Sequence, residues 1–406
     1  MNMHDDEAAD KRAEIRLAAE YDAATAERLD KLLADQAGMV DAALAHAAKT
    51  QGQAMLGIPL QSLPWLTDTL CGLRQAMVLA GPPNCGKSVL TTQMLLDAAA
   101  DPDTVAVSIS TEMDPVYDTL VRTLSGRAGV EYRRFLLGSP HAERCQQTGL
   151  QQSWEVLQRV QTEADALRAM QKSGRLTLCH VRDLGDLAPL TPDGHALDRV
   201  EALVAKAIDR AGARRAMVLI DYMQLLNVRP TVTTAADRFE WRDDLERDRY
   251  IVECISRMHN AMPYNALVVI SEQAKGRSGV EGDIFAQLGT GRTAYAAGLA
   301  VNLWHPDAEK GSLMHAEIGE SWVWTDDDAE LMAAVREGNR RGRAVVVVEV
   351  VKSRNGARRK RIPLVFNHEL HRVTEATSRQ RCLDLLTERS TLDDDVDLSA
   401  LTRLRA

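Results

Sequence analysis

Short runs of apolar residues alternate with amphipathic segments through the middle of the chain. Runs of strand length occur at 76–80, 105–109, 176–179, 216–220, 266–270, 299–303 and 344–351. Segments with a helical spacing of apolar residues separate most of them, at 116–124, 153–170, 197–210 and 249–260. Alternation of this kind predicts an α/β fold, in which a mostly parallel, twisted sheet is flanked by helices on both faces.

The segments at either end have different patterns. Residues 1–50 are rich in alanine and acidic residues and carry a sparse apolar stripe, which predicts a short helical N-terminal extension. A helix that docks onto a neighbouring subunit and a solvated leader both fit this extension. Glycine and proline punctuate residues 51–75, which we predict to be a linker. The main domain is then 76–372, with 306–341 as an insertion and 373–406 as a C-terminal tail.

Composition limits the class of protein. The 406 residues are 45% hydrophobic and 26% charged, as in a globular protein of one large or two ordinary domains. There is no apolar run of about 18 residues to span a membrane, and the acidic N-terminus does not resemble a signal peptide. The six cysteines form no C-x-x-C pair, so we expect neither a zinc site nor a disulfide framework, and we expect a cytoplasmic protein.

One stretch carries a specific chemical pattern. Gly81-Pro82-Pro83-Asn84-Cys85-Gly86-Lys87-Ser88 fits G-x-x-x-x-G-K-[ST] and lies between a predicted strand and a predicted helix. Glycines let backbone N–H groups converge on a phosphate, and the helix N-terminus adds a positive dipole end. A chance glycine-rich turn is the alternative. The residues predicted to bind ATP are Gly81, Pro82, Asn84, Cys85, Gly86, Lys87, Ser88 and Val89. An exposed Cys85 thiol would make this loop sensitive to oxidation.

Polar side chains follow several of the predicted strands, where an α/β sheet binds its ligands. Asp221 ends a buried strand and is predicted to hold Mg²⁺ together with Ser88. Glu112 is the candidate general base for ATP hydrolysis, although a surface carboxylate is an equal alternative. Gln273 could sense the γ-phosphate, or lie in an ordinary turn.

Two cations follow the last long predicted strand. Lys352 and Arg354 project to the same face if the chain is extended there. They could neutralise charge on a γ-phosphate, or they could be solvated charges at the end of a strand.

Together these strings resemble a known family. Gly-Pro-Pro-Asn-Cys-Gly-Lys-Ser, Ser-Thr-Glu-Met, Leu-Ile-Asp-Tyr-Met-Gln-Leu-Leu, Ile-Ser-Glu-Gln and Lys-Ser-Arg-Asn-Gly resemble, in order and spacing, the RecA-type C-terminal motor domain of DnaB-like replicative helicases. The resemblance covers roughly residues 55–370. It implies that Gln273 couples the γ-phosphate to DNA-binding loops, and that Lys352 and Arg354 act in trans on the next subunit of a hexamer. It also implies primase or a loader as a partner, although the family's N-terminal helical domain is absent or reduced to residues 1–50.

In this family single-stranded DNA binds loops that face the central channel. Candidates here are 228–248 and 274–293, and the second contains Lys275, Arg277 and Arg292 among several glycines. A mobile loop with a few cations suits sequence-independent contact with a DNA backbone, although an ordinary surface loop has the same composition. A net charge of −9 argues against a nucleic-acid partner unless the cations gather locally, as nine lysines and arginines do in 340–361.

The function predicted from the sequence is that of a DNA helicase or translocase, which hydrolyses ATP at subunit interfaces to move on single-stranded DNA. The first alternative is a RecA-fold ATPase that binds DNA as a recombinase or loader does, without unwinding it. The second is an assembly protein switched by ATP, with no nucleic-acid substrate.

Overall fold

The computed structural model describes residues 57–135, 154–185, 187–191, 194–230, 241–261, 266–272, 298–305, 315–318, 322–325, 327–353 and 360–388. All of them lie in one unit, which begins at Gly57. The strands are β1 (Ala76–Gly81), β2 (Thr104–Ser110), β3 (Leu176–His180), β4 (Arg215–Asp221), β5 (Ala266–Glu272), β6 (Leu299–Trp304), β7 (His315–Ile318), β8 (Trp322–Thr325), β9 (Arg343–Ser353), β10 (Arg361–Asn367) and β11 (Arg372–Glu375). The α-helices are α3 (Pro64–Leu70), α4 (Lys87–Ala100), α5 (Val121–Ala128), α7 (Trp154–Ser173), α8 (Asp198–Ala211), α9 (Asp244–Ala261), α11 (Ala329–Arg340) and α12 (Arg379–Thr387).

The main sheet contains nine strands in the order β11-β10-β9-β6-β1-β5-β4-β2-β3. The six strands from β6 to β3 in this order are parallel. In contrast, β9 is antiparallel to β6, β10 is antiparallel to β9, and β11 is antiparallel to β10. All seven apolar runs of the sequence are strands here. Strands buried on both faces appear as continuous apolar runs, which accounts for six of them, whereas β3, at the edge of the sheet, is only partly buried. The predicted α/β fold with a mostly parallel sheet is confirmed.

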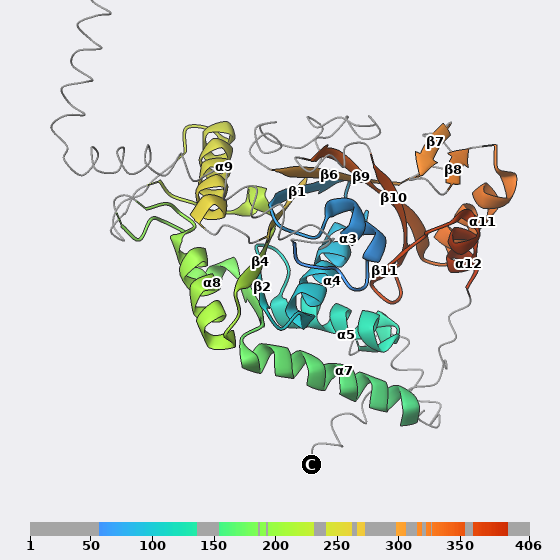
Figure 1. The fold of residues 1–406 in the computed structure, drawn as a ribbon, viewed down its shortest axis with the longest axis horizontal. Helices are drawn as coiled ribbons and strands as arrows, with labels where there is room; N and C mark the ends of the chain where they lie inside the picture. The colour runs from blue at the N-terminus through green and yellow to red at the C-terminus, as the bar shows by residue number, and fades with distance from the viewer. Residues whose placement is uncertain are drawn as a thin grey trace, which may run out of the picture. The chain divides into compact units, whose positions relative to one another are not determined.

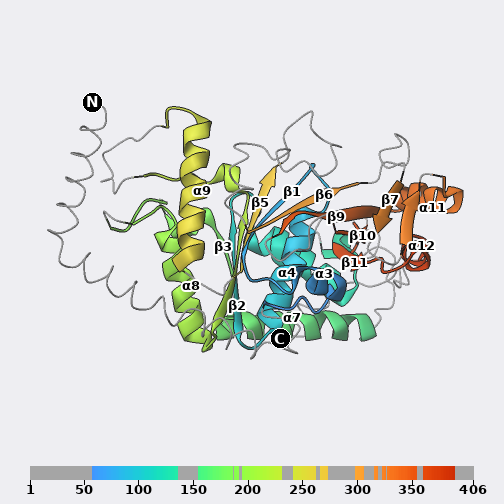
Figure 2. The same ribbon diagram turned by 45° about the horizontal axis from the view of Figure 1, so that its top comes forward.

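Helices cover both faces of the sheet (Figures 1 and 2). Met77 and Leu79 of β1 pack with residues of α3, α4 and α7 on one face. Ala76 of the same strand packs with α8 and α9 on the other face, because successive side chains of a strand point to opposite sides. The core is therefore two apolar layers separated by the sheet.

The predicted linker is too long. Within 57–75, Leu60, Leu63, Leu66, Leu70 and Leu73 are all buried, and they belong to the core under β1. Pro64 starts α3 rather than breaking it, because the first turn of a helix needs no N–H at that position. The Glu375 carboxylate of β11 accepts from the free backbone N–H groups of Trp65 (2.9 Å) and Leu66 (2.7 Å), and so holds the start of this helix against the sheet.

The domain also extends further toward the C-terminus than predicted. The predicted tail begins at residue 373, but β11 continues to Glu375 and α12 follows, capped by the Ser378 hydroxyl. Within the predicted insertion, β7 pairs with β8, and α11 packs with α12. Trp324, Val345 and Val365 lie in this third apolar cluster, on the sheet face that also carries α8 and α9. The insertion and the start of the tail therefore complete each other's core.

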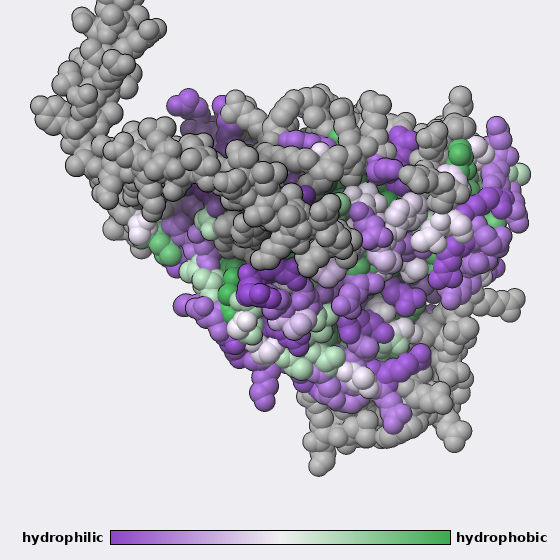
Figure 3. Space-filling model, in the orientation of Figure 1, coloured by the Kyte–Doolittle hydropathy of each residue, from purple (hydrophilic) through white to green (hydrophobic). Residues whose placement is uncertain are grey.

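The visible surface of the described residues is mostly hydrophilic, and hydrophobic residues occupy small, separate areas of it (Figure 3). Among the described helices, none has the length and hydropathy needed to cross a membrane.

Candidate nucleotide site

The glycine-rich loop joins the carboxyl end of β1 to the first turn of α4, as predicted. At two positions of this loop there is a steric reason for glycine. A Cβ on Gly81 would lie 2.8 Å from the Leu303 carbonyl oxygen and 2.8 Å from the Cys85 sulfur. Gly86, which precedes α4, has a φ of 83°, where a side chain is strained. The loop is therefore a tight turn that leads into a helix N-terminus, the arrangement that binds phosphate in many proteins.

The Lys87 side chain folds back over this loop. Its ammonium group donates to the carbonyl oxygens of Gly81 (2.9 Å) and Pro82 (2.8 Å), and the residue is buried. The same nitrogen lies 6.0 Å from the centre of the Tyr222 ring. A buried cation needs anionic or dipolar partners, so phosphate oxygens entering the loop would take over part of the role of these two carbonyls.

Asp221 lies beside Ser88, although 133 positions of sequence separate them, because β4 and β1 end at the same edge of the sheet. Burial raises the pKa of the Asp221 carboxyl to about 6, an effect that Glu112 adds to, and that the Ser88 hydroxyl and Lys87 oppose. One carboxylate oxygen, Oδ1, is buried without a hydrogen-bond partner. A buried carboxylate with an unused oxygen, next to a hydroxyl, is an oxygen donor set that fits Mg²⁺.

Glu112 is held near Asp221 by the residue before it. Thr111 donates from its backbone N–H (2.8 Å) and its hydroxyl (3.0 Å) to the Asp221 carbonyl, and the same hydroxyl accepts from Tyr222 N–H (2.8 Å). These bonds tie the carboxyl ends of β2 and β4 together. The predicted base and the predicted metal ligand therefore belong to one rigid edge.

A main cavity of about 740 Å³ opens over this edge. Its lining includes the loop residues Asn84, Gly86, Lys87, Ser88 and Val89, together with Glu112. The structure thus brings these predicted residues into one site. Gly81, Pro82 and Cys85 contribute the turn beneath the cavity.

Seven further residues line the main cavity and were not among the predicted site residues: Met113, Asp118, Arg122 of α5, Tyr222, Phe366 of β10, and His368 and His371 of the turn after it. Three of them, Phe366, His368 and His371, could have been predicted from the direction of the strand that carries or precedes them. Because β10 is antiparallel to β9 and β9 to β6, β10 runs parallel to β1, and its carboxyl end reaches the same edge. The residues at the end of this strand are therefore candidates on the same grounds as those after β2 and β4.

Lys352 lies at the end of the sheet opposite to the glycine-rich loop. It follows an apolar strand, like the other candidates, but β9 is antiparallel to β6. Lys352 pairs with Ala300, which pairs with Val78, so it lies toward the amino ends of the parallel strands. It is absent from the lining of the main cavity, and it does not meet this chain's own glycine-rich loop.

Several other predicted residues lie outside the described part of the chain. These are Gln273, Lys275, Arg277, Arg292 and Arg354. Their predicted roles stay predictions.

Cys85 is buried in the loop, with 1% of its surface exposed. Burial raises the pKa of its thiol, and the neighbouring Lys87 only partly opposes this shift. Because the thiolate is the form that reacts with oxidants, this cysteine is protected, and the oxidation expected of an exposed thiol does not apply to it.

A second polar cluster lies at the start of α8, where His195, Asp198 and Glu201 come within ligand distance of one another. The Nδ1 atom of His195 accepts from Leu197 N–H (3.2 Å), so Nε2 carries the proton and donates to Glu201 (2.8 Å). Asp198 accepts from His195 N–H (3.0 Å). This cluster caps a helix and leaves no imidazole lone pair for a metal.

Solved structures of two similar proteins share this fold. The first is an ATPase domain with a TM-score of 0.55 and 15% identity, and the match covers 82% of this chain and 98% of that one. The second is a DnaB-like replicative helicase, described with its interactions with primase, with a TM-score of 0.57 and 12% identity, and the match covers 91% of this chain and 76% of that one. No protein-family model and no curated protein matches the sequence. The chain has the RecA-like fold of the DnaB-like helicase ATPase domain, as the resemblance predicted.

Proposed function

We propose that this chain is an ATP-dependent DNA motor of the DnaB-like helicase class, which hydrolyses ATP and moves on single-stranded DNA. The observation that carries the proposal is the meeting of Lys87, Ser88, Glu112 and Asp221 at one sheet edge, under a cavity large enough for a nucleotide. The two similar structures support it, since one is described as an ATPase domain and the other as a helicase.

The roles of the four residues follow from their positions. The triphosphate lies on the loop, and Lys87 turns its ammonium group from the Gly81 and Pro82 carbonyls toward the phosphate oxygens. Ser88 and the unused oxygen of Asp221 hold Mg²⁺, which neutralises charge on the phosphates when it is bound. Glu112 orients the attacking water and accepts its proton.

The position of Lys352 supports an active site shared between subunits. Lys352 pairs with Ala300, and Ala300 pairs with Val78, which lies three residues before Gly81 on β1, or about 10 Å along the strand; β9 is two strands away from β1. Lys352 therefore lies away from this chain's own loop, and we propose that Lys352 and Arg354 act on a nucleotide held by another copy. A contact between opposite edges of identical chains is heterologous and generates a ring or a helical filament, and we propose a hexamer.

Partners follow from the same proposal. Single-stranded DNA binds Lys275, Arg277 and Arg292 in the predicted loop, and Gln273 connects that loop to the γ-phosphate. One of the two similar structures is described with its interactions with primase, so primase or a loader is the proposed protein partner.

A strand-displacement assay on a forked duplex tests the proposal. We expect displacement with ATP and Mg²⁺ and none with a non-hydrolysable analogue. Fluorescence anisotropy of a labelled single strand, measured with that analogue, separates the alternatives. Binding without displacement would indicate a recombinase-like or loader-like ATPase. The absence of both would leave an assembly protein switched by ATP.

A further inference from the structure

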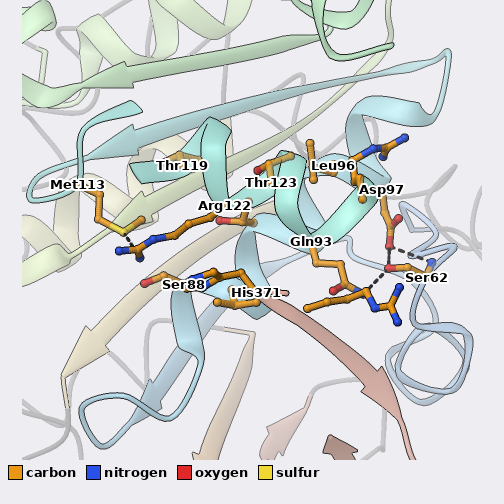
Figure 4. A pocket seen from close by; sticks show the side chains of 15 residues that line it. Ser62, Ser88, Gln93, Leu96, Asp97, Met113, Thr119, Arg122, Thr123 and His371 are labelled. Carbon is orange, nitrogen blue, oxygen red and sulfur yellow. Dashed lines mark hydrogen bonds between the residues drawn. The ribbon is translucent and has the colours of Figure 1, made fainter. Parts of the chain in front are cut away.

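A smaller side pocket of about 210 Å³ opens next to the main cavity, between α4 and α5 (Figure 4). Ser88, Val89, Met113, Arg122 and His371 line both spaces. The side pocket therefore adjoins the place where a triphosphate would lie.

The side pocket follows α4 away from the loop. Ser88, Thr92 and Leu96 line it at four-residue spacing, which places them on one face of the helix. At a rise of 1.5 Å per residue, Thr92 lies about 6 Å beyond Ser88 and Leu96 about 12 Å beyond it. A nucleotide bound on the loop carries its ribose and base away from the phosphates, and this pocket gives them a path of suitable length.

The walls suit a flat aromatic ring. Val89, Leu96 and Met113 are apolar, whereas Arg122 and His371 offer planar groups that stack on rings. Burial and the nearby Arg122 lower the pKa of His371 to about 4, so its imidazole is uncharged at neutral pH. The Arg122 guanidinium donates to the Met113 sulfur (3.4 Å) and lies 3.6 Å from an Asp118 carboxylate oxygen. The Tyr132 ring contacts both Arg122 and His371, so both planar groups are held in place.

The far end of the side pocket is polar and ordered (Figure 4). Ser62 donates to one oxygen of the Asp97 carboxylate from its backbone N–H (3.0 Å) and its hydroxyl (2.6 Å). Gln93 donates to the Ser62 hydroxyl (2.8 Å) and to the Val373 carbonyl (3.1 Å). Burial raises the pKa of the Asp97 carboxyl, and the hydrogen bonds from Ser62 and the charge of Arg127 oppose this shift. In its ionised form Asp97 only accepts hydrogen bonds, so it favours a ligand that presents an N–H group at this depth.

We propose that the side pocket receives the purine base of the bound nucleotide, with Arg122 and His371 against the ring and Asp97 accepting from an exocyclic amino group. This inference rests on the proposed function, because the triphosphate must be seated on the loop for the base to reach the pocket. The side pocket then lets the protein discriminate between nucleotides by their base, whereas the loop binds only their phosphates.

Calorimetric titration of the full chain with three Mg²⁺ complexes tests the inference. The ligands are ATP, inosine triphosphate, in which oxygen replaces the amino group of the base, and inorganic tripolyphosphate, which has no base. We expect the wild type to bind ATP at least tenfold more tightly than either of the others. Thr92→Trp, which fills the side pocket, should remove most of this advantage and leave tripolyphosphate binding unchanged. Ala205→Trp, on the exposed face of α8, is the matched control and should bind all three as the wild type does.

Asp97→Asn provides a second, milder variant. We expect it to reduce the preference for ATP over inosine triphosphate about tenfold, because the carboxylate that reads the amino group is gone. If ATP binds Thr92→Trp as tightly as it binds the wild type, or if Asp97→Asn keeps the full preference, the side pocket does not receive the base. If neither ATP nor tripolyphosphate binds the wild type, the proposed function and this inference are overturned together.

Discussion

Asp221 is predicted to reduce the stability of the nucleotide-free protein. Its pKa rises from 3.8 to about 6 on folding, chiefly because the carboxyl is buried. This difference in pKa corresponds to about 3 kcal/mol of differential stability between the two protonation states. The sign follows from linkage, since the folded chain holds this proton more tightly than the unfolded chain does. The cost is absent below pH 4, grows between pH 4 and pH 6, and is complete above that range.

Asp221→Asn removes the buried charge and keeps the shape of the side chain. At pH 8 we expect the variant to be more stable than the wild type by about 1–2 kcal/mol, because the amide adds its own smaller desolvation cost. Between pH 5 and pH 8 this advantage should widen by about 1 kcal/mol, as the wild-type carboxyl loses its proton. The variant should also lose Mg²⁺-dependent ATP hydrolysis.

Thermal and urea unfolding, followed by circular dichroism with a chelator present, measure this difference at the two pH values. Added Mg²⁺ and nucleotide should stabilise the wild type more than the variant. A stability difference that does not change with pH would show that Asp221 is not the buried, proton-linked group described here. A variant that is less stable than the wild type at pH 8 would show the same.

Four further outcomes are expected. Lys87→Ala should reduce ATP hydrolysis to background, measured by phosphate release, because the phosphates lose their buried cation. Glu112→Gln should keep nucleotide binding and slow turnover by about 10²–10⁴-fold in single-turnover kinetics, and a smaller loss would exclude it as the base. Arg354→Ala should bind ATP without hydrolysing it, and mixing it with Glu112→Gln subunits should restore part of the activity only if active sites are shared. Trp324→Ala should lower the free energy of unfolding by about 3–5 kcal/mol, whereas the neighbouring, exposed Val323→Ala should change it by less than about 0.5 kcal/mol.

Local sequence patterns predict seven of the nine strands of the main sheet, together with the glycine-rich loop. Most of these strands are buried on both faces and so appear as apolar runs, and the loop is identified by its spacing alone. Asp221 and Glu112 were found because parallel strands end at one edge of the sheet. These inferences need only the chain direction and the burial of each strand.

Strand direction beyond β6 could not be read from the sequence. Because β9 is antiparallel to β6, Lys352 lies at the edge opposite to the site. The turn after β10 lies at the site, and His368 and His371 of this turn line the main cavity. The ends of the domain were misjudged for a related reason. Gly57, Pro59 and Pro64 indicate a linker when taken alone, but the leucines between and after them are buried in a core that β11 completes, about 300 residues away in the sequence.

The rate of ATP hydrolysis, measured with Mg²⁺ in the presence and absence of single-stranded DNA, tests the proposed motor most directly. We expect turnover that requires Mg²⁺ and that single-stranded DNA increases, by a factor that falls as salt is raised, since the proposed contacts are with the phosphate backbone. Hydrolysis that single-stranded DNA leaves unchanged at every salt concentration would contradict the DNA motor. A chain that hydrolyses no ATP under any of these conditions would contradict the nucleotide site itself.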